Sequence, residues 1–339
     1  MSFASTGPAA LSLVVPMYNE EQIVPVFYRR AVAALEQTGV PFEIVFVDDG
    51  SQDGTFAALR SLAQRDSRIR VVRFSRNFGH QTAVSAGLHY ARGAAVAVID
   101  GDLQDPPEFV PKLYEKLREG YEVVYAVRRS RKENAFKRAA YRLFYRLLQR
   151  LSYIDIPLDS GDFAIMDRRV VDELNRMPER NRFVRGIRAW VGFRQVGLEY
   201  DREPRFAGES KYSLSKLFKL AYDGLVSYSF VPLRMVTHFG FAVSAVAFGL
   251  ILYLLVLRVV YGERLVTGWT STVVVILFLG GIQLLSLGIL GEYVGRIFDE
   301  VKRRPLYVVR ETVGFEENSG AEVAGIGQDG LAARMVRGS

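Results

Sequence analysis

The chain has 339 residues, with 44 Lys and Arg against 37 Asp and Glu, so its formal net charge is +7. It has no cysteine, which excludes disulfides, thiolate nucleophiles and zinc–cysteine sites, and its three histidines make a multi-histidine metal site unexpected. Hydrophobic residues make up 49% of the chain beside 24% charged residues, so part of the apolar content should be segregated. Residues 1–16 carry no basic cluster, and we predict no signal peptide.

Short apolar runs alternate with helical patterns through the first part of the chain. The expected strands are Leu13–Pro16, Ile44–Asp48, Arg70–Phe74, Ala95–Asp100 and Val123–Val127. The expected helices are Glu21–Gln37, Thr55–Gln64, Thr82–Ala91 and Glu108–Arg118. Strands that alternate with helices of this length are typical of βαβ units, so the sequence predicts an α/β fold with a mostly parallel sheet.

Polar side chains follow four of these expected strands. They are Tyr18-Asn19-Glu20, Asp48-Asp49-Gly50-Ser51, Arg76-Asn77 and Asp100-Gly101-Asp102. Ligands of parallel α/β sheets lie beyond the carboxyl ends of the strands, so the pattern predicts a binding site there. Taken singly, Glu20 could compensate a helix N-terminus and residues 48–51 could be a plain turn.

The tripeptide Asp100-Gly101-Asp102 is the strongest candidate for metal chemistry. Mg²⁺ and Mn²⁺ take few protein carboxylates and complete their shell with phosphate oxygens. Such tripeptides are common in surface loops, but the strand end before it and the residues Gln104–Glu108 after it favour a metal site.

Two long uncharged segments lie in the last third of the chain. Phe239–Leu257 has 19 residues without a charge and Leu265–Gly291 has 27, so each is long enough to span a bilayer. The alternative is a pair of buried helices in a soluble core. The short connector predicts an antiparallel hairpin, and the basic residues around Arg234 and Lys302–Arg304 predict a cytoplasmic N-terminal domain and C-terminus.

The segment Ser213–Leu225 has one apolar helical face flanked by lysines, which favours a helix in the membrane interface over one packed on the domain. Residues 314–339 are expected to be disordered. The predicted organisation is therefore a catalytic domain at 1–212, an interfacial region at 213–234, two transmembrane helices within 235–292 (about 236–258 and 268–291), and a C-terminal segment at 293–339.

Four motifs carry a resemblance to a known family. PMYNE, VDDGSQDGT, DGDLQDPPE and RFAGESKYS, followed by two spans, resemble the polyprenyl-phosphate glycosyltransferases over roughly residues 11–310. These are inverting family 2 enzymes of the GT-A fold, related to dolichol-phosphate mannose synthase. The resemblance implies a UDP-sugar donor, a polyprenyl (undecaprenyl) phosphate acceptor, Mg²⁺ or Mn²⁺, and a multi-pass, homo-oligomeric protein of the bacterial inner membrane.

The resemblance also implies roles for individual residues. The donor would be held by Pro16, Tyr18, Glu20, Val47, Asp49, Asp100, Gly101, Arg128 and Arg138. The metal would be held by Asp102 and Gln104, and the acceptor phosphate by Arg205, Ser210 and Lys211. Catalytic roles would fall to Asp102, Lys211, Asp159 and Asp162.

A general base is not required, because a lipid monophosphate with a second pKa of about 6 is already anionic at neutral pH. Asp159 is therefore expected to orient the acceptor, with a loop cap as the alternative. His80 fits a structural role at a helix start as well as a sugar contact.

A basic run follows the fifth expected strand. Arg128–Arg150 holds nine Lys and Arg against the single acid Glu133, and arginine donors suit phosphate oxygens. Nucleic acid is the competing partner, but the two spans and the lack of an aromatic RNA-binding motif argue against it.

The expected activity is transfer of a sugar, glucose first, from UDP to undecaprenyl phosphate. Alternatives are 4-deoxy-4-formamido-arabinose from UDP and mannose from GDP. A processive polysaccharide synthase is disfavoured, because the extra spans and the Q-x-x-R-W segment are missing. A catalytically silent membrane scaffold is the alternative from another class.

Overall fold

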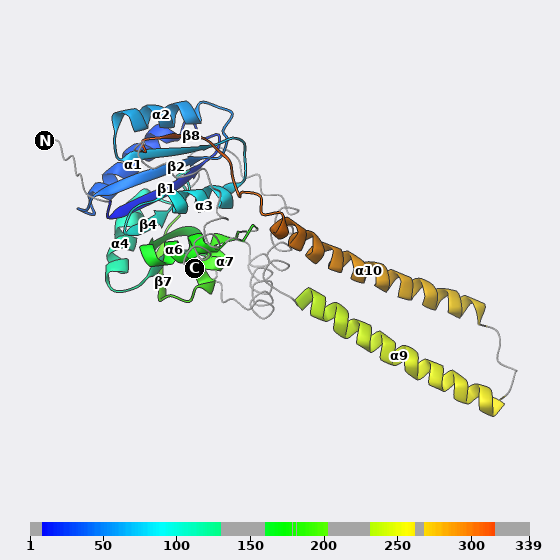
Figure 1. Ribbon diagram of the computed structural model, residues 1–339. Helices are drawn as coiled ribbons and strands as arrows, with labels where there is room; N and C mark the ends of the chain where they lie inside the picture. Colours follow the sequence, from blue (N-terminus) through cyan, green and yellow to red (C-terminus); the bar gives the residue numbers. More distant parts are fainter. Residues whose placement is uncertain are drawn as a thin grey trace, which may run out of the picture. The chain divides into compact units, whose positions relative to one another are not determined.

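The computed structural model describes residues 9–129, 160–177, 179–180, 182–202, 231–261 and 268–315. The chain forms two compact units: one contains the sheet together with the C-terminal residues from Arg303, and the other contains two long helices (Figure 1). Several predicted features lie outside the described residues: Arg138, Asp159, Arg205, Ser210, Lys211, the helix at 213–225 and the tail from 316.

The first unit is built on an eight-stranded sheet in the order β7-β5-β6-β4-β1-β2-β3-β8. Its strands are β1 Leu11–Met17, β2 Phe42–Asp48, β3 Ile69–Phe74, β4 Ala95–Val98, β5 Val123–Arg128, β6 Ser160–Asp167, β7 Gln195–Tyr200 and β8 Val309–Val313. The central strands β4, β1, β2 and β3 pair in parallel, as does β5 with β7. Strands β6 and β8 pair antiparallel with their neighbours.

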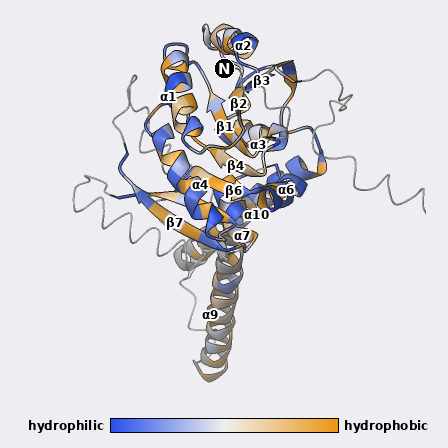
Figure 2. Ribbon diagram, turned by 90° about the vertical axis from the view of Figure 1, so that its left-hand side faces the viewer, coloured by the Kyte–Doolittle hydropathy of each residue, from blue (hydrophilic) through white to orange (hydrophobic). Residues whose placement is uncertain are grey.

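Helices cover both faces of this sheet. They are α1 Val24–Glu36, α2 Thr55–Arg65, α3 His80–Tyr90, the 3₁₀ turn η1 Pro107–Phe109, α4 Val110–Arg118, α6 Arg168–Arg176 and α7 Val184–Trp190. One buried cluster joins alternate strand residues such as Leu13 and Phe46 to α1, α2 and α4, while the other joins residues such as Val14 to α3, α6 and α7. The central strands are hydrophobic on both faces, as expected for a parallel sheet between two helical layers (Figure 2).

The first five predicted strands and the helices between them are confirmed, with bounds shifted by a few residues. The sequence interpretation did not include β6, β7 or β8. Strand β8 comes from the segment after the two long helices, which the predicted organisation placed apart from the catalytic domain, and it pairs with β3 at one edge of the sheet.

The second unit contains α9 Val231–Tyr261 and α10 Trp269–Val301, which contact one another. Both helices expose large apolar side chains, including Phe241 at 72% and Leu284 at 72%. Within the described part of the chain, Phe278–Val301 is long and apolar enough to cross a membrane, whereas the apolar stretch Val236–Leu250 of α9 is shorter. The helices lie where the two spans were predicted, and α10 continues ten residues beyond the predicted end near 291.

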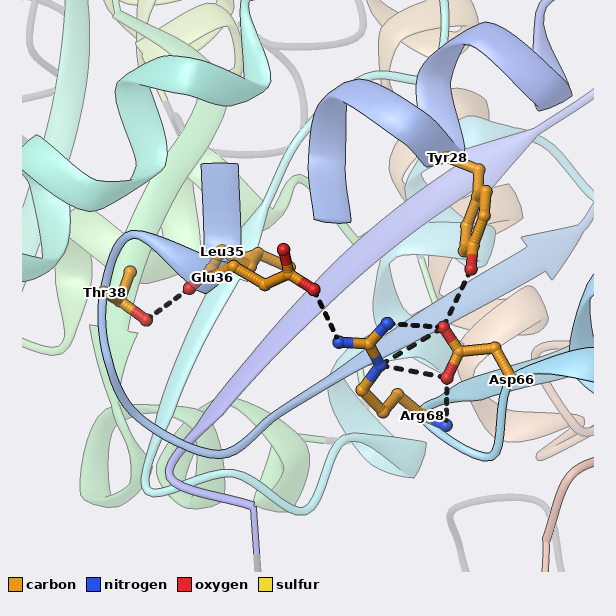
Figure 3. Close-up of polar contacts among 6 residues, drawn as sticks. All are labelled: Tyr28, Leu35, Glu36, Thr38, Asp66 and Arg68. Atoms are coloured by element: carbon orange, nitrogen blue, oxygen red, sulfur yellow. Dashed lines mark hydrogen bonds and ion pairs between the residues drawn. The ribbon is translucent and has the colours of Figure 1, made fainter. Parts of the chain in front are cut away.

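A polar cluster closes the amino end of the sheet between α1 and β3 (Figure 3). The Arg68 guanidinium donates to Asp66 Oδ2 at 2.8 Å and to Glu36 Oε1 at 3.2 Å, and the Tyr28 hydroxyl donates to Asp66 Oδ2 at 2.8 Å. The hydrogen bonds from Arg68 and Tyr28 hold the pKa of Asp66 below its usual range, although burial alone would raise it. This cluster, hereafter the Arg68 cluster, fixes the end of α1 to the turn before β3.

Candidate functional site

The loops that follow β1 and β2 are tied together at the carboxyl end of the sheet. Ser51 Oγ accepts from Asn19 N at 3.0 Å, Asn19 Oδ1 accepts from Gln52 N at 2.9 Å, and Thr55 Oγ1 accepts from Glu20 N at 2.8 Å. Asn19 has a φ of 55°, a left-handed conformation that asparagine tolerates better than most residues. The two predicted motifs therefore form one surface.

Asp49 directly follows β2 and is buried, with 3% of it exposed. Its carboxylate accepts from Phe78 N at 2.7 Å and from Gly79 N at 3.0 Å, so the loop between β3 and α3 holds it in place. Burial raises the pKa of Asp49 although these hydrogen bonds lower it. Gly50 is required beside it, because its φ is +70° and an added Cβ would lie 2.3 Å from the backbone carbon of Arg76.

The other residues that were predicted to bind the nucleotide sugar, on or directly after β1, β2 and β4, lie at the same end of the sheet. Pro16 pairs with Val47, and an added Cβ on Gly101 would meet Met17 Sδ at 2.4 Å. Tyr18 is 42% exposed, so its ring is accessible for stacking. The structure thus brings the predicted residues of three neighbouring strands together.

His80 lies between two carboxylates, at the start of α3. Its Nε2 lies 3.4 Å from Asp100 Oδ1 and 3.3 Å from Asp162 Oδ2. Burial alone would lower the pKa of His80, but the hydrogen bond with Asp162 and the charges of Asp100 and Asp162 raise it to about 9. The imidazole is therefore charged at neutral pH.

Asp162, on β6, is surrounded by donors. Its Oδ2 accepts from Gln81 Nε2 at 2.8 Å and its Oδ1 from Arg185 Nε at 3.4 Å. Burial would raise the pKa of Asp162, but the hydrogen bond with His80 and the charge of Arg185 hold it well below its usual range. A carboxylate this well stabilised is a poor proton acceptor, which favours an orienting role over that of a base.

Asp100 is less well compensated than Asp162. Its Oδ1 is buried and has no hydrogen-bond partner among the described residues; the ion pair with His80 is its nearest charge contact. Burial raises the pKa of Asp100 to about 6, and the charges of Asp162, Asp105 and Asp102 add to this. Asp100 is therefore held by fewer donors than Asp162, its neighbour across His80.

Asp102 and Gln104 form a tight turn after β4. Asp102 Oδ1 accepts from Gln104 N at 3.1 Å, and Leu103 between them has a φ of 58°. Within the described residues no three His, Asp or Glu side chains are arranged to enclose a metal ion. The Asp100 oxygen that accepts no hydrogen bond among the described residues, and the side-chain oxygens of Asp102 and Gln104, nevertheless fit a hard cation that takes its other ligands from a diphosphate.

Arg128, at the end of β5, lies near Asp100 and Asp105. Its Nε lies 3.4 Å from Tyr200 Oη, and an added Cβ on Gly161 would lie 3.5 Å from its Nη2. Tyr200 in turn donates to Asp105 Oδ1, which also pairs with Arg202 at 3.2 Å. Arg128 thus lies close to Asp100 and Asp105, and its contact with the donor phosphate stays a prediction.

Arg188 on α7 is a buried cation that the sequence interpretation missed. It is 2% exposed, its guanidinium carbon lies 5.5 Å from the Tyr125 ring centroid, and its Nε and Nη2 have no hydrogen-bond partner among the described residues. Burial lowers the pKa of Arg188 to about 10. Arg185, Gln81, Asp105 and Tyr200 were missed too; only Asp105, inside the DGDLQDPPE motif, carried a sequence signal.

Comparisons with known proteins identify the family of this chain. The family described as glycosyl transferase family 2 matches residues 12–174. The chain is 48% identical over 306 residues to the uncharacterized glycosyltransferase YkcC of Bacillus subtilis, covering 90% of this chain and 94% of the relative. It is 43% identical over 303 residues to the bactoprenol glucosyl transferase of Shigella phage SfII, covering 89% and 98%.

Among solved structures, glucosyl-3-phosphoglycerate synthase from Mycobacterium tuberculosis, in complex with Mn²⁺, UDP and phosphoglyceric acid, superposes with a TM-score of 0.44 at 22% identity. It covers 64% of this chain and 76% of that one. The family match and the near-full-length relatives settle the classification. The chain belongs to glycosyltransferase family 2 and is a glycosyltransferase.

Proposed function

We propose that this glycosyltransferase moves glucose from UDP-glucose to undecaprenyl phosphate at the cytoplasmic face of a bacterial inner membrane. The observation that carries the proposal is the pairing of a carboxylate-rich strand end with a near-full-length similarity to a bactoprenol glucosyl transferase. The apolar surfaces of α9 and α10 support a membrane hairpin, since both helices expose large hydrophobic side chains.

The reaction is a single displacement. A phosphate oxygen of the lipid attacks the anomeric carbon of the sugar, the bond from that carbon to the UDP diphosphate breaks, and the electron pair leaves with UDP. The products are UDP and a polyprenyl-monophosphate sugar with inverted anomeric configuration. No proton has to move, because the attacking phosphate oxygen is already anionic. The protein therefore has to align the two substrates and stabilise the departing charge.

The described residues divide these tasks between them. Asp49 holds the nucleoside, and Tyr18, which is 42% exposed, stacks on its base. Asp102 and Gln104 would hold Mg²⁺ or Mn²⁺, and the ion would supply positive charge to the leaving diphosphate. Arg128 lies beside the diphosphate, and Asp162, fixed by Gln81 and Arg185, orients the groups around the anomeric carbon.

The residues outside the described part of the chain keep their predicted roles. We propose Arg138 as a further diphosphate contact, and Arg205, Ser210 and Lys211 as the acceptor-phosphate group. Asp159 orients the acceptor, and the helix at 213–225 lies at the membrane surface. The homo-oligomer is part of the same proposal.

The test is to incubate the purified full-length protein with undecaprenyl phosphate and Mg²⁺ or Mn²⁺, each with UDP-glucose, UDP-4-deoxy-4-formamido-arabinose or GDP-mannose. The expected result is a lipid product heavier than the acceptor by one hexose, formed from UDP-glucose. Product from another donor alone would overturn the choice of glucose. Absence of product from every donor, with the protein folded, would favour a silent scaffold.

A further inference from the structure

The segment that follows α10 returns to the sheet and lies against the loop that holds Asp49. Strand β8 pairs antiparallel with β3, and Val308 O accepts from Ser75 N at 2.9 Å, directly after β3 ends. Tyr307, one residue earlier, is only 8% exposed and belongs to the core on the α3 face of the sheet. The C-terminal segment therefore contacts the first residues of the β3–α3 loop.

Two phenylalanine rings, Phe74 and Phe78, connect Tyr307 to that loop. The Tyr307 ring stacks on Phe74, with centroids 4.9 Å apart and planes 17° from parallel. Phe74 meets Phe78 edge to face, with centroids 5.7 Å apart. Phe78 N and Gly79 N are the two donors to the Asp49 carboxylate. A change at Tyr307 is thus two ring contacts away from the groups that orient Asp49.

The loop needs this support because its own backbone is irregular. Gly79 has a φ of +101°, and the Arg76 guanidinium lies 4.2 Å from the Phe78 ring centroid on the loop's outer part. Phe74, which is 1% exposed, packs between Phe78 and Tyr307 on the buried side of the loop. Without Tyr307, Phe74 and then Phe78 could change rotamer, which would move the two N–H groups away from Asp49.

We propose that Tyr307 is a positioning residue for the nucleotide, which acts through Phe74 and Phe78 on Asp49 without touching the substrate. The inference rests on the proposed function, in which Asp49 holds the nucleoside. On this proposal, the segment that follows α10 supports the nucleotide-binding residues of the sheet, to whose compact unit it belongs.

The test is UDP affinity, measured by calorimetry on the full-length protein in detergent with Mn²⁺. Tyr307→Leu keeps apolar bulk and removes the ring, and we expect UDP binding to weaken about 3- to 10-fold, the worth of a stacked aromatic pair. Tyr307→Phe keeps the ring and should restore binding. The KM for the sugar donor should rise by a similar factor, while the KM for the lipid acceptor stays unchanged.

Val313→Ala is the matched control. Val313 lies at the end of β8, six residues after Tyr307, and packs on the opposite core; it pairs with Val71, away from the loop. Its loss should lower thermal stability without changing UDP affinity. The proposal is overturned if Tyr307→Leu binds UDP like wild type, if Tyr307→Phe is as weak as Tyr307→Leu, or if Val313→Ala weakens UDP equally.

The failure of the proposed function has a separate signature. If the wild-type protein binds GDP instead of UDP, the choice of UDP-glucose as sugar donor is overturned. The affinities of the same Tyr307 and Val313 variants would then be measured for GDP. Wild-type protein that binds neither nucleotide would refute the proposed function and the role of Tyr307 together.

Discussion

The two ends of the parallel strands carry polar clusters of opposite design. At the amino end, the Arg68 cluster pairs each carboxylate oxygen of Asp66 with a donor. The buried Glu43 accepts from Ser12 Oγ and Arg92 N through Oε1, and its Oε2 is neutralised by an ion pair with Arg70 at 3.0 Å. At the carboxyl end, Asp100 Oδ1 is buried without a hydrogen bond among the described residues, and the charge beside it is the half-exposed His80, whose Nε2 lies 3.4 Å away. A neutralised cluster stabilises a fold, whereas uncompensated buried charge costs stability and marks a site that awaits a ligand.

The comparison predicts that substitutions at the two ends of the sheet change different measured quantities. Substitutions at the carboxyl end should alter transfer and leave unfolding nearly unchanged. Substitutions in the Arg68 cluster should do the reverse.

The largest effect is expected for Asp102→Asn. Loss of the carboxylate at the proposed metal position should lower transfer about 10³-fold, because the leaving diphosphate loses its counter-charge. The turn survives, since an asparagine Oδ1 still accepts from Gln104 N. Transfer is measured by mass analysis of the lipid product, with melting temperature in parallel.

Asp172→Asn is the control for this variant, since it removes a half-exposed carboxylate from α6 whose contact is an ion pair with Arg168 at 3.7 Å. It should transfer sugar normally. Full activity of Asp102→Asn, or of wild-type protein in excess chelator, would contradict the metal assignment.

An intermediate effect, on stability alone, is expected for Arg68→Ala. The variant leaves Asp66 and Glu36 without their cation and removes the guanidinium 4.7 Å from the Phe42 ring centroid. Because Arg68 is 36% exposed, solvent screening limits the loss to about 1–2 kcal/mol of unfolding free energy. Thermal unfolding measures the loss, and turnover should stay within about twofold of wild type.

Arg65→Ala, which removes an exposed arginine from the end of α2, should change neither quantity. A tenfold fall in turnover in Arg68→Ala would show that the amino end of the sheet is not independent of the site.

The sequence predicted the parts of this molecule whose signals are local. Strands β1 to β5 are apolar runs bounded by polar turns, and the motifs at their ends placed Asp49, Asp100 and Asp102 correctly at one edge. Strand β6 was missed because its start, Ser160-Gly161-Asp162, was considered only for its carboxylate. Strand β8 is five residues long and half-exposed, so its pairing with β3 depends on contacts that sequence distance conceals.

The residues of the site also divide into those with a local sequence signal and those that only the fold brings together. His80 could be interpreted either way from the sequence, because only the fold brings Asp100 from β4 and Asp162 from β6 to its ring. Arg185 and Arg188 sit in a short helix without a motif, and nothing local distinguishes them from surface arginines. Their proximity to Asp162 arises from packing of α7 on the sheet.

The smallest expected effect is on the pH dependence of stability, through His80. Its pKa is about 9 in the folded protein, against an ordinary value of about 6.5 in an unfolded chain. A raised pKa means that the folded state binds the proton more tightly. The stabilisation is therefore fully present below about pH 6.5 and is lost as the pH rises to about 9.

His80→Gln removes this dependence while leaving a donor near the two carboxylates. The melting temperature of wild type minus that of the variant, measured without metal, should be largest at pH 6 and smallest at pH 9.5. Because 44% of the side chain remains exposed, the change in that difference should be only about 1–3 °C. A difference that stays constant across this range would mean that His80 is neutral in the folded protein. The carboxyl end would then be even less well compensated than its contacts indicate.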